Sequence, residues 1–254
     1  MKKMLFILFV AFLLLACVFN YNNNPAIIIR NAGVKAAADT GFIQLRYRLY
    51  LLGVLPVAEA YFQEPLLEDY KGTKVYHLRA KAVNLGWVSP FFSGQVDLDS
   101  YIDASNFNPL LFRQRGKVRG RNDMNKEVLY DQVKGVMSIG EVRRQILANT
   151  QDPLSAVFNL RRMDFAKNKS FEMSLNTNQK NYVLEGEADL KYISAGREKY
   201  KATIVKAEIR RRDKNPYHKS NIDMVLLNEK NNMPVLIKVF ASGLFLNAKL
   251  VEVR

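Results

Sequence analysis

Alternation of apolar and polar side chains with a period of two is the feature that most limits how this chain can fold. The pattern dominates from Gly41 onward and is cleanest over 184–192, where apolar or small residues alternate with Glu185, Glu187, Asp189 and Lys191. Successive side chains of a β-strand point to opposite faces of its sheet, so the alternation predicts half-buried strands. Gly and Asn-rich turns separate the predicted strands, which are 43–51, 54–63, 75–82, 90–99, 109–120, 126–134, 168–175, 184–192, 199–211, 220–228, 234–241 and 244–253.

Helix signals are few. Asp152 followed by Pro153 is typical of an N-cap and a first helical position, and Leu154, Phe158 and Arg161 then share one helix face. We expect a second helix over 141–148. The sequence therefore predicts a mainly β fold: one strongly curved or barrel-like antiparallel sheet with one or two short helices, because exposed sheet edges invite aggregation and strands close or curl to avoid it.

The first residues have the composition of an export signal. Lys2 and Lys3 precede an uncharged, apolar run from Met4 to Phe19. This run is shorter than the ~20 apolar residues that a membrane-spanning helix usually needs, and it suits the core of a signal peptide. We expect 1–16 to be the signal peptide, 17–40 a tether and 41–254 a single β-rich domain.

The end of the apolar run, Leu14-Leu15-Ala16-Cys17, resembles the bacterial lipobox. In that motif the cysteine thiol receives a diacylglycerol and the cysteine becomes the new N-terminus, so Cys17 is the predicted lipidation site. Cys17 is the only cysteine, so no disulfide competes for it. Val18 follows it in place of the Asp that retains some lipoproteins at the inner membrane, and the resemblance therefore favours the outer membrane. The alternative is a plain secretory signal or an uncleaved anchor in which Cys17 is incidental.

The net charge of the chain limits the classes of molecule that it is expected to bind. The formal net charge is +14, which suits nucleic acid, an anionic membrane surface or acidic glycans. Export and the absence of a helix-turn-helix, zinc-finger or RNP pattern argue against nucleic acid. Lipid or lipopolysaccharide phosphates remain, beside the alternative of a basic surface with no dedicated ligand.

Several short segments, in this order, are similar to a known family. Leu52-Gly53-Val54-Leu55-Pro56, Ser89-Pro90-Phe91-Phe92 and, most specifically, Gln151-Asp152-Pro153-Leu154-Ser155 resemble the bacterial family called domain of unknown function 3108. The resemblance runs from about residue 41 to 253. It departs at 225–228, where the family tends to carry a Trp and an acidic turn, and at Ala58, where Gly is expected. It implies an exported, β-rich protein and no particular activity.

A basic strip is the most distinctive candidate site. Its five cations alternate along one predicted strand and project from one face: Arg113, Arg115, Lys117, Arg119 and Arg121. Guanidinium groups bind phosphate through a bidentate fork, so Arg113, Arg115, Lys117, Arg119 and Arg161 are candidate ligand-binding residues. The alternative, a solvated outer face that keeps an edge strand from aggregating, is the simpler explanation of the strip. Arg161 is equally explained as the partner of a core carboxylate.

Catalytic and metal signals are weak. The chain has no Gly-x-Ser-x-Gly elbow, and its histidines, His77 and His218, lack triad or ligand-spaced partners. We expect no metal and no cofactor, and we assign Asp152 the role of structural helix cap. Asp97, Asp99 and Asp103 form an acidic cluster that is either a solvated strand end or, less simply, the site of a hydrolase.

Three hypotheses follow. The first is a non-enzymatic, lipid-anchored periplasmic protein that binds an apolar or amphiphilic anionic ligand such as a lipid or lipopolysaccharide. The second is a structural or interaction module that binds another envelope protein or a glycan, and the third is a hydrolase. A carrier requires an apolar cavity of a few hundred Å³. A module requires a filled core and an exposed apolar patch, and an enzyme requires polar groups that converge in a cleft.

Overall fold

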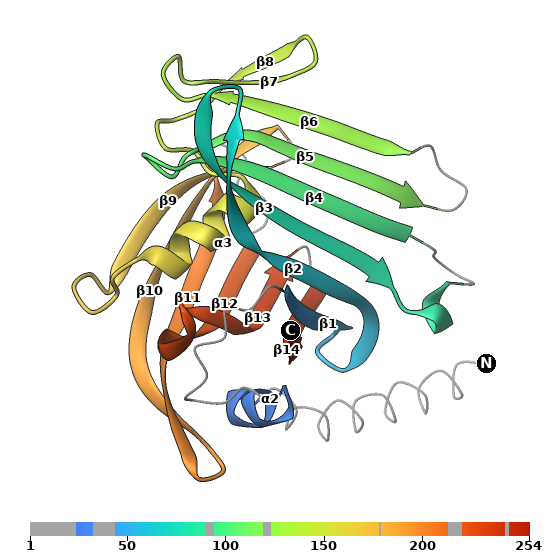
Figure 1. The fold of residues 1–254 in the computed structure, drawn as a ribbon, viewed down its shortest axis with the longest axis vertical. Coiled ribbons are helices and arrows are strands. Elements are labelled where there is room, and N and C mark those ends of the chain that lie inside the picture. The colour runs from blue at the N-terminus through green and yellow to red at the C-terminus, as the bar shows by residue number, and fades with distance from the viewer. Residues whose placement is uncertain are drawn as a thin grey trace, which may run out of the picture.

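The computed structural model describes residues 24–32, 44–89, 94–118, 123–177, 179–212, 220–241 and 244–254. Cys17 and Arg119 lie outside the described residues. The described part of the chain contains a single large sheet, drawn in Figure 1, with two α-helices against it. No helix in the described ranges is long and apolar enough to cross a membrane.

The sheet has fourteen antiparallel strands in the order β8-β7-β6-β5-β4-β3-β2-β1-β14-β13-β12-β11-β10-β9. It consists of two meanders that meet where the first strand pairs with the last, Leu45 opposite Val253. The strands are β1 (Gln44–Leu51), β2 (Leu55–Tyr70), β3 (Thr73–Asn84), β4 (Gly94–Asp103), β5 (Pro109–Val118), β6 (Met124–Asp131), β7 (Val136–Ile139), β8 (Val142–Gln145), β9 (Ser170–Thr177), β10 (Lys180–Ala195), β11 (Glu198–Arg211), β12 (Ser220–Leu227), β13 (Met233–Ala241) and β14 (Leu244–Val253).

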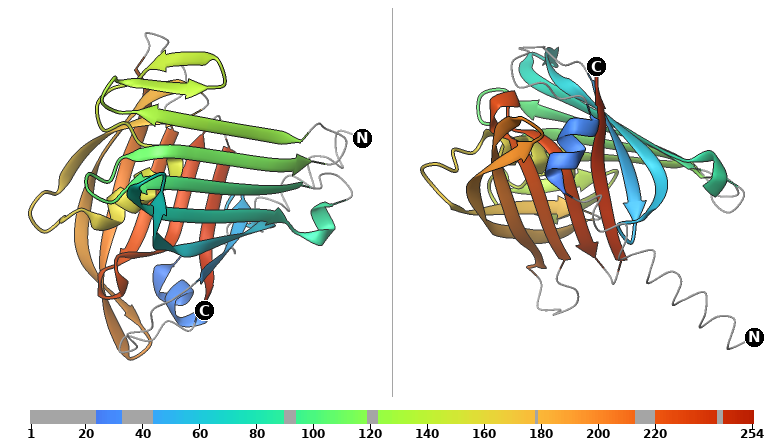
Figure 2. Two further views of the ribbon diagram at one scale, coloured as in Figure 1. Left: turned by 45° about the horizontal axis from the view of Figure 1, so that its top comes forward. Right: turned by 90° about the horizontal axis from the view of Figure 1, so that it is seen from below.

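The sheet curls on itself without closing, as Figures 1 and 2 show, and its edges are β8 and β9. Two contacts link the regions of the two edges. Gln151 bridges Leu175 of β9, and the Asn181 side chain donates to the carbonyl of Gln145 at 2.7 Å. The predicted fold class, one strongly curved antiparallel sheet with short helices, is confirmed.

Alternation explains the strands. Along β11, Val205 and Ala207 pack toward one face, and Tyr200 and Ala202 pack toward the other. Tight turns then link neighbouring strands, as at Lys71 and Gly72, whose φ values of 53° and 82° suit a two-residue hairpin. Each of the twelve predicted strands corresponds to an observed strand.

Helix α3 (Pro153–Arg162) fills the inside of the curl, in yellow in front of β10 and β11 in Figure 1. Its Leu154 and Phe158 pack with strands of the first meander. Its Ala156 and Leu160 pack with strands of the second meander. The helix therefore supplies the core that joins the two halves of the sheet.

The predicted helix over 141–148 is wrong. Residues 142–145 form strand β8, which pairs with β7 through a tight turn, Ile139 opposite Val142. Both strands are only four residues long, too short for a clear alternation. The local sequence pattern of this segment is ambiguous, and pairing with β7 therefore determines its secondary structure.

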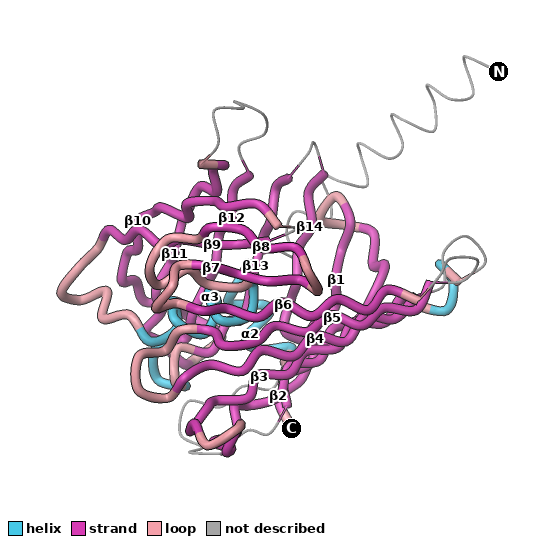
Figure 3. Tube along the Cα trace, turned by 90° about the horizontal axis from the view of Figure 1, so that it is seen from above, coloured by secondary structure: helices cyan, strands magenta, loops and turns pink. Residues whose placement is uncertain are grey.

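Helix α2 (Pro25–Asn31) lies within the segment expected to be a tether. Its Ile28 and Ile29 are buried and belong to a cluster with Tyr200, Ala202 and Leu227. These two isoleucines therefore hold α2 against the sheet. Two short 3₁₀ turns, η2 (Gly86–Val88) and η3 (Asn228–Lys230), complete the described elements. Figure 3 shows the two α-helices in cyan against the strands.

Candidate functional site

A wide groove of about 1440 Å³ lies on the face of β2–β6 that points away from α3. The alternation of β3 produces it. Leu78 and Ala80 face the core, and His77, Arg79 and Lys81 therefore face the groove. We call this surface the outer groove.

The basic strip lines this groove, as its spacing predicts. Arg113, Arg115 and Lys117 of β5 all border it, whereas Arg119 lies outside the described residues and cannot be placed. Acidic residues neutralise much of the strip. The Arg113 Nε contacts Glu127 Oε2 at 2.6 Å, and an Arg115 terminal nitrogen contacts Asp99 Oδ2 at 2.7 Å. The groove is therefore a surface of mixed charge rather than a phosphate cradle.

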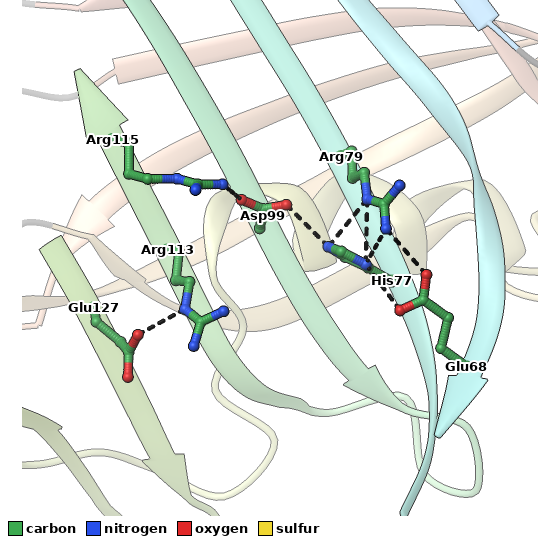
Figure 4. A network of polar contacts seen from close by, with 7 residues as sticks. All are labelled: Glu68, His77, Arg79, Asp99, Arg113, Arg115 and Glu127. Atoms are coloured by element: carbon green, nitrogen blue, oxygen red, sulfur yellow. Dashed lines mark hydrogen bonds and ion pairs between the residues drawn. The ribbon is translucent and has the colours of Figure 1, made fainter. Parts of the chain in front are cut away.

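His77 is the centre of a network that ties β2, β3 and β4 together (Figure 4). Its Nε2 lies 2.9 Å from Asp99 Oδ1, and its Nδ1 lies 3.1 Å from Glu68 Oε2 and 2.9 Å from an Arg79 nitrogen. The imidazole also stacks on Tyr101, with ring centroids 4.1 Å apart. Both ring nitrogens therefore have polar partners, and the imidazole joins side chains of three strands.

Electrostatics at Asp99 follow from these contacts. The hydrogen bond from His77, together with the weaker one from Arg115, holds the pKa of the Asp99 carboxyl below its usual range, although burial acts in the opposite direction. The ionised carboxylate is therefore the form that the folded state favours. This network was missed in the sequence because its members come from three strands, and no spacing along the chain connects Glu68, His77 and Asp99.

The other two acids of the predicted acidic cluster have separate local partners. Asp97 accepts a hydrogen bond from Gln95 at 2.7 Å. Asp103 accepts from the backbone and hydroxyl of Ser105 in the turn after β4. The three carboxylates therefore hold neighbouring groups and do not converge on one point. Within the described ranges, no group of three or more His, Cys, Asp or Glu residues is arranged to hold a metal ion.

Asp152 lies at the N-cap of α3 and is fully buried. Its Oδ1 accepts from the backbone of Leu154 at 2.8 Å and of Ser155 at 3.0 Å, and its Oδ2 accepts from the Ser100 hydroxyl at 2.6 Å. Burial raises the pKa of the carboxyl, and these hydrogen bonds oppose that rise. Asp152 thus attaches the start of α3 to β4, and it is not among the residues that line the outer groove.

Arg161 lies far from the basic strip, at the other end of α3. It borders a pocket of about 360 Å³, which we call the Arg161 pocket. The walls of this pocket include Glu64, Tyr76, Phe158, Arg161, Arg162 and Asn231. The structure therefore does not bring Arg161 together with Arg113, Arg115 and Lys117.

The Arg161 side chain is largely buried but incompletely paired. A terminal nitrogen donates to the carbonyl of Asn231 at 3.1 Å and lies 3.8 Å from Glu64 Oε1, a loose ion pair. Its Nε and the Glu64 Oε2 are buried without a hydrogen-bond partner. Buried polar atoms normally have partners, so these two atoms mark a place that an additional polar group can satisfy.

Behind Arg161 the core is almost solid. An apolar cavity of about 40 Å³ separates α3 from β1 and β13, and it shares Glu64, Phe158 and Arg161 with the pocket. This volume is far below the few hundred Å³ that an enclosed lipid carrier requires. Burial raises the pKa of Glu64, which the positive charge of Arg161 partly offsets. Burial also raises the pKa of Tyr47 well above its usual range.

Comparison with known proteins identifies the family. The model of a protein family of unknown function, DUF3108, matches residues 46–243. The chain belongs to the DUF3108 family. No curated protein matches the sequence of this DUF3108 chain.

Two solved structures resemble the DUF3108 chain in fold. One is a β-barrel-like protein of domain of unknown function DUF1849 from Brucella abortus, with 13% sequence identity and a TM-score of 0.56 over 83% of this chain and 95% of that chain. The other is a "putative lipoprotein" from Parabacteroides distasonis, with 11% identity and a TM-score of 0.37 over 86% of this chain and 98% of that chain. At 13% identity the similarity to the first structure concerns the fold alone. The TM-score of 0.37 is too low for the second structure to show a common fold.

Proposed function

We propose that this DUF3108 protein is a non-enzymatic, lipid-anchored protein of the cell envelope that binds an amphiphile with an anionic group in the Arg161 pocket. The observation that carries the proposal is a largely buried arginine whose Nε lacks a partner at the border of a pocket of about 360 Å³. Ligand pockets are commonly about 300–1,000 Å³, mostly apolar, with a few placed polar groups.

The pocket suits both halves of such a ligand. Its aromatic walls, Tyr76 and Phe158, offer apolar surface. Arg161 offers an unpaired donor, and Arg162 adds a second guanidinium, which stacks over the Phe107 ring at 3.7 Å. Charge-assisted hydrogen bonds to a carboxylate or phosphate are among the strong ones. Glu64 opposes an anion, so binding should strengthen as falling pH protonates it.

The outer groove is a less suitable anion site because its charges nearly balance. Five cations line it (Arg79, Lys81, Arg113, Arg115 and Lys117) beside four acids (Glu59, Asp97, Asp99 and Asp123). All three of its arginines already contact carboxylates. The groove therefore supports the proposal less than the pocket does.

The proposed location rests on the first residues of the sequence. We infer from the lipobox-like Leu14–Cys17 segment that the mature chain begins at Cys17 and is held on the periplasmic face of a membrane. Two or more acyl chains give stable anchoring, whereas a single chain binds reversibly. Val18 favours the outer membrane.

The test is calorimetric titration with octyl phosphate, using octyl glucoside as a neutral-headed comparison. We expect octyl phosphate to bind with one-to-one stoichiometry. Arg161→Gln should weaken it by about 10- to 100-fold, because a hydrogen bond to a charged group contributes about 1.5–3 kcal/mol. Arg115→Gln is the matched control, since it removes the same charge from the outer groove. Unfolding temperatures establish that both variants are folded.

Two results would contradict the proposal. Absence of binding to the unmodified chain excludes an anionic amphiphile of this kind. If Arg115→Gln loses binding while Arg161→Gln keeps it, the binding site lies in the outer groove instead.

An interaction module remains a second candidate because the core is filled and apolar side chains are exposed. Leu66 and Leu67, near the end of β2, are 54% and 59% exposed. A partner protein that covers them should be cross-linked through a photoreactive residue at position 67, and Leu66→Ser should abolish that adduct. Cross-linking that is insensitive to Leu66→Ser would exclude this patch as the interface.

A further inference from the structure

The tip of the β10–β11 hairpin and helix α2 lie at the same end of the molecule. Figure 1 shows both at the bottom of the long axis, with β7 and β8 at the top. Contacts between α2 and β10 agree with this placement. Helix α2 and the β10–β11 tip therefore lie at the end of the molecule opposite β7 and β8.

Chain length brings this end close to the lipid anchor proposed above, on which the present inference rests. Pro25, the first residue of α2, follows Cys17 by eight residues. A fully extended chain spans at most about 3.6 Å per residue, so α2 begins within about 29 Å of the anchored cysteine. Because α2 packs against the sheet through Ile28 and Ile29, the end of the sheet beside α2 stays near the membrane.

The tip of the hairpin has the composition of a membrane-facing surface. Between residues 190 and 201 it carries four exposed cations, Lys191, Arg197, Lys199 and Lys201. Glu198, the one acid in that stretch, accepts a hydrogen bond from the Tyr200 hydroxyl. Cations close to an anionic leaflet are attracted to its surface.

An aromatic side chain accompanies these cations. Tyr192 is 72% exposed and stands opposite Lys201 in the register of the two strands. Tyrosine is enriched at membrane interfaces because its ring is apolar and its hydroxyl is polar. We infer that the β10–β11 tip rests on the anionic lipid headgroups of the membrane that holds Cys17.

This inference fixes the orientation of the molecule. The β10–β11 tip and α2 face the bilayer, and β7 and β8 point away from it. Lys199 and Lys201 provide the electrostatic contact, and Tyr192 enters the headgroup layer.

The experiment uses the lipidated protein in vesicles of equimolar phosphatidylcholine and phosphatidylglycerol with brominated acyl chains, which quench nearby tryptophan. Trp87 is the single tryptophan, so Trp87→Phe gives a silent background. In that background Tyr192→Trp reports on the tip. Val133→Trp, at a position 99% exposed in the loop between β6 and β7, reports on the far end.

We expect the bromolipids to quench the tryptophan of Tyr192→Trp and to leave that of Val133→Trp as it is in solution. Reversing two charges, Lys199→Glu with Lys201→Glu, should lower the docked population at least about tenfold and restore the emission. Arg143→Glu with Arg144→Glu changes the net charge equally on exposed β8 and should leave quenching intact.

Each contrary outcome overturns the inference in a recognisable way. Equal emission from both reporters in protein that mass spectrometry shows to be lipidated rejects the orientation but leaves the anchor proposal standing. Such a result would leave the tip free for a protein partner. An unmodified Cys17 rejects the anchor and the orientation together.

Discussion

At the scale of single residues, the best-defined polar feature is the network around His77. Its ring is buried, and Asp99 and Glu68 lie on either side of it. The Asp99 carboxylate accepts from both His77 and Arg115, but Arg115 is 60% exposed, so solvent weakens that second contact. Asp99 therefore stabilises the folded state mainly through its contact with His77.

We predict that Asp99→Asn lowers the free energy of unfolding by about 1–3 kcal/mol near neutral pH, because charged hydrogen bonds in a buried site are lost. The pKa of Asp99 is lowered in the folded state, so its stabilisation is complete above the unfolded value of about 3.9 and is lost as pH falls through the folded pKa. Denaturant unfolding over a pH series should show the two stability curves converge in acid.

Asp97→Asn serves as the matched control, since Asp97 lies on the same face of β4 and its side-chain bond is to Gln95. It should leave unfolding free energy and its pH dependence nearly unchanged. A difference between wild type and Asp99→Asn that stays constant down to acid pH would contradict the assignment.

At the scale of elements, the long β10–β11 pair depends on one close backbone approach. A Cβ added at Gly186 would lie 2.3 Å from the carbonyl oxygen of Lys206 and 2.7 Å from the Cα of Ala207, both backbone atoms of the neighbouring strand. Glycine at this point in the alternation of β10 therefore allows a strand-to-strand distance that any side chain would increase.

We predict that Gly186→Ala destabilises the protein by about 1–3 kcal/mol, because the two strands must move apart. The control is Gly86→Ala, where an added Cβ meets nothing within 4 Å; it should change stability by less than about 0.5 kcal/mol. Chemical denaturation of both variants provides the comparison. If Gly186→Ala and Gly86→Ala are equally stable, β10 and β11 move apart at a lower energetic cost than their backbone distances indicate.

At the scale of the whole molecule, the sheet is completed only when the two ends of the chain meet. Leu45 pairs with Val253, and α3 then packs with both meanders. Contacts between such distant residues slow folding, because the loop must close before the contact forms. The fold therefore depends on the whole domain and not on either meander alone.

The whole-molecule prediction concerns the anchor. Protein expressed with its own signal in a bacterial host should yield a mature chain that begins at Cys17 and carries added diacylglycerol, because the thiol is the acceptor in the lipobox. Intact mass spectrometry measures this directly, and detergent phase partitioning should follow it. Exchanging 1–17 for a plain secretory signal should move the protein to the aqueous phase, whereas an unmodified Cys17 in the native form would contradict the anchor.

The local pattern of the sequence was enough to establish the strands and the principal helix. Period-two alternation located β10 and its neighbours because a half-buried strand must alternate. Asp152 followed by Pro153 located the start of α3 because a cap and a first-turn proline are local signals. The strip of Arg113, Arg115 and Lys117 was also placed correctly on one face, since facing depends only on spacing within one strand.

Tertiary structure alone decided the remaining features, because they depend on residues that are far apart in the chain. The sequence could not show that α3 fills the curl, that α2 packs against the sheet, or that β8 is a strand. It also could not show that Asp99 pairs with Arg115 and His77, or that Arg161 lies in a separate pocket near Glu64. Strand order and curvature determine which charges meet, and they arise only when the chain is packed.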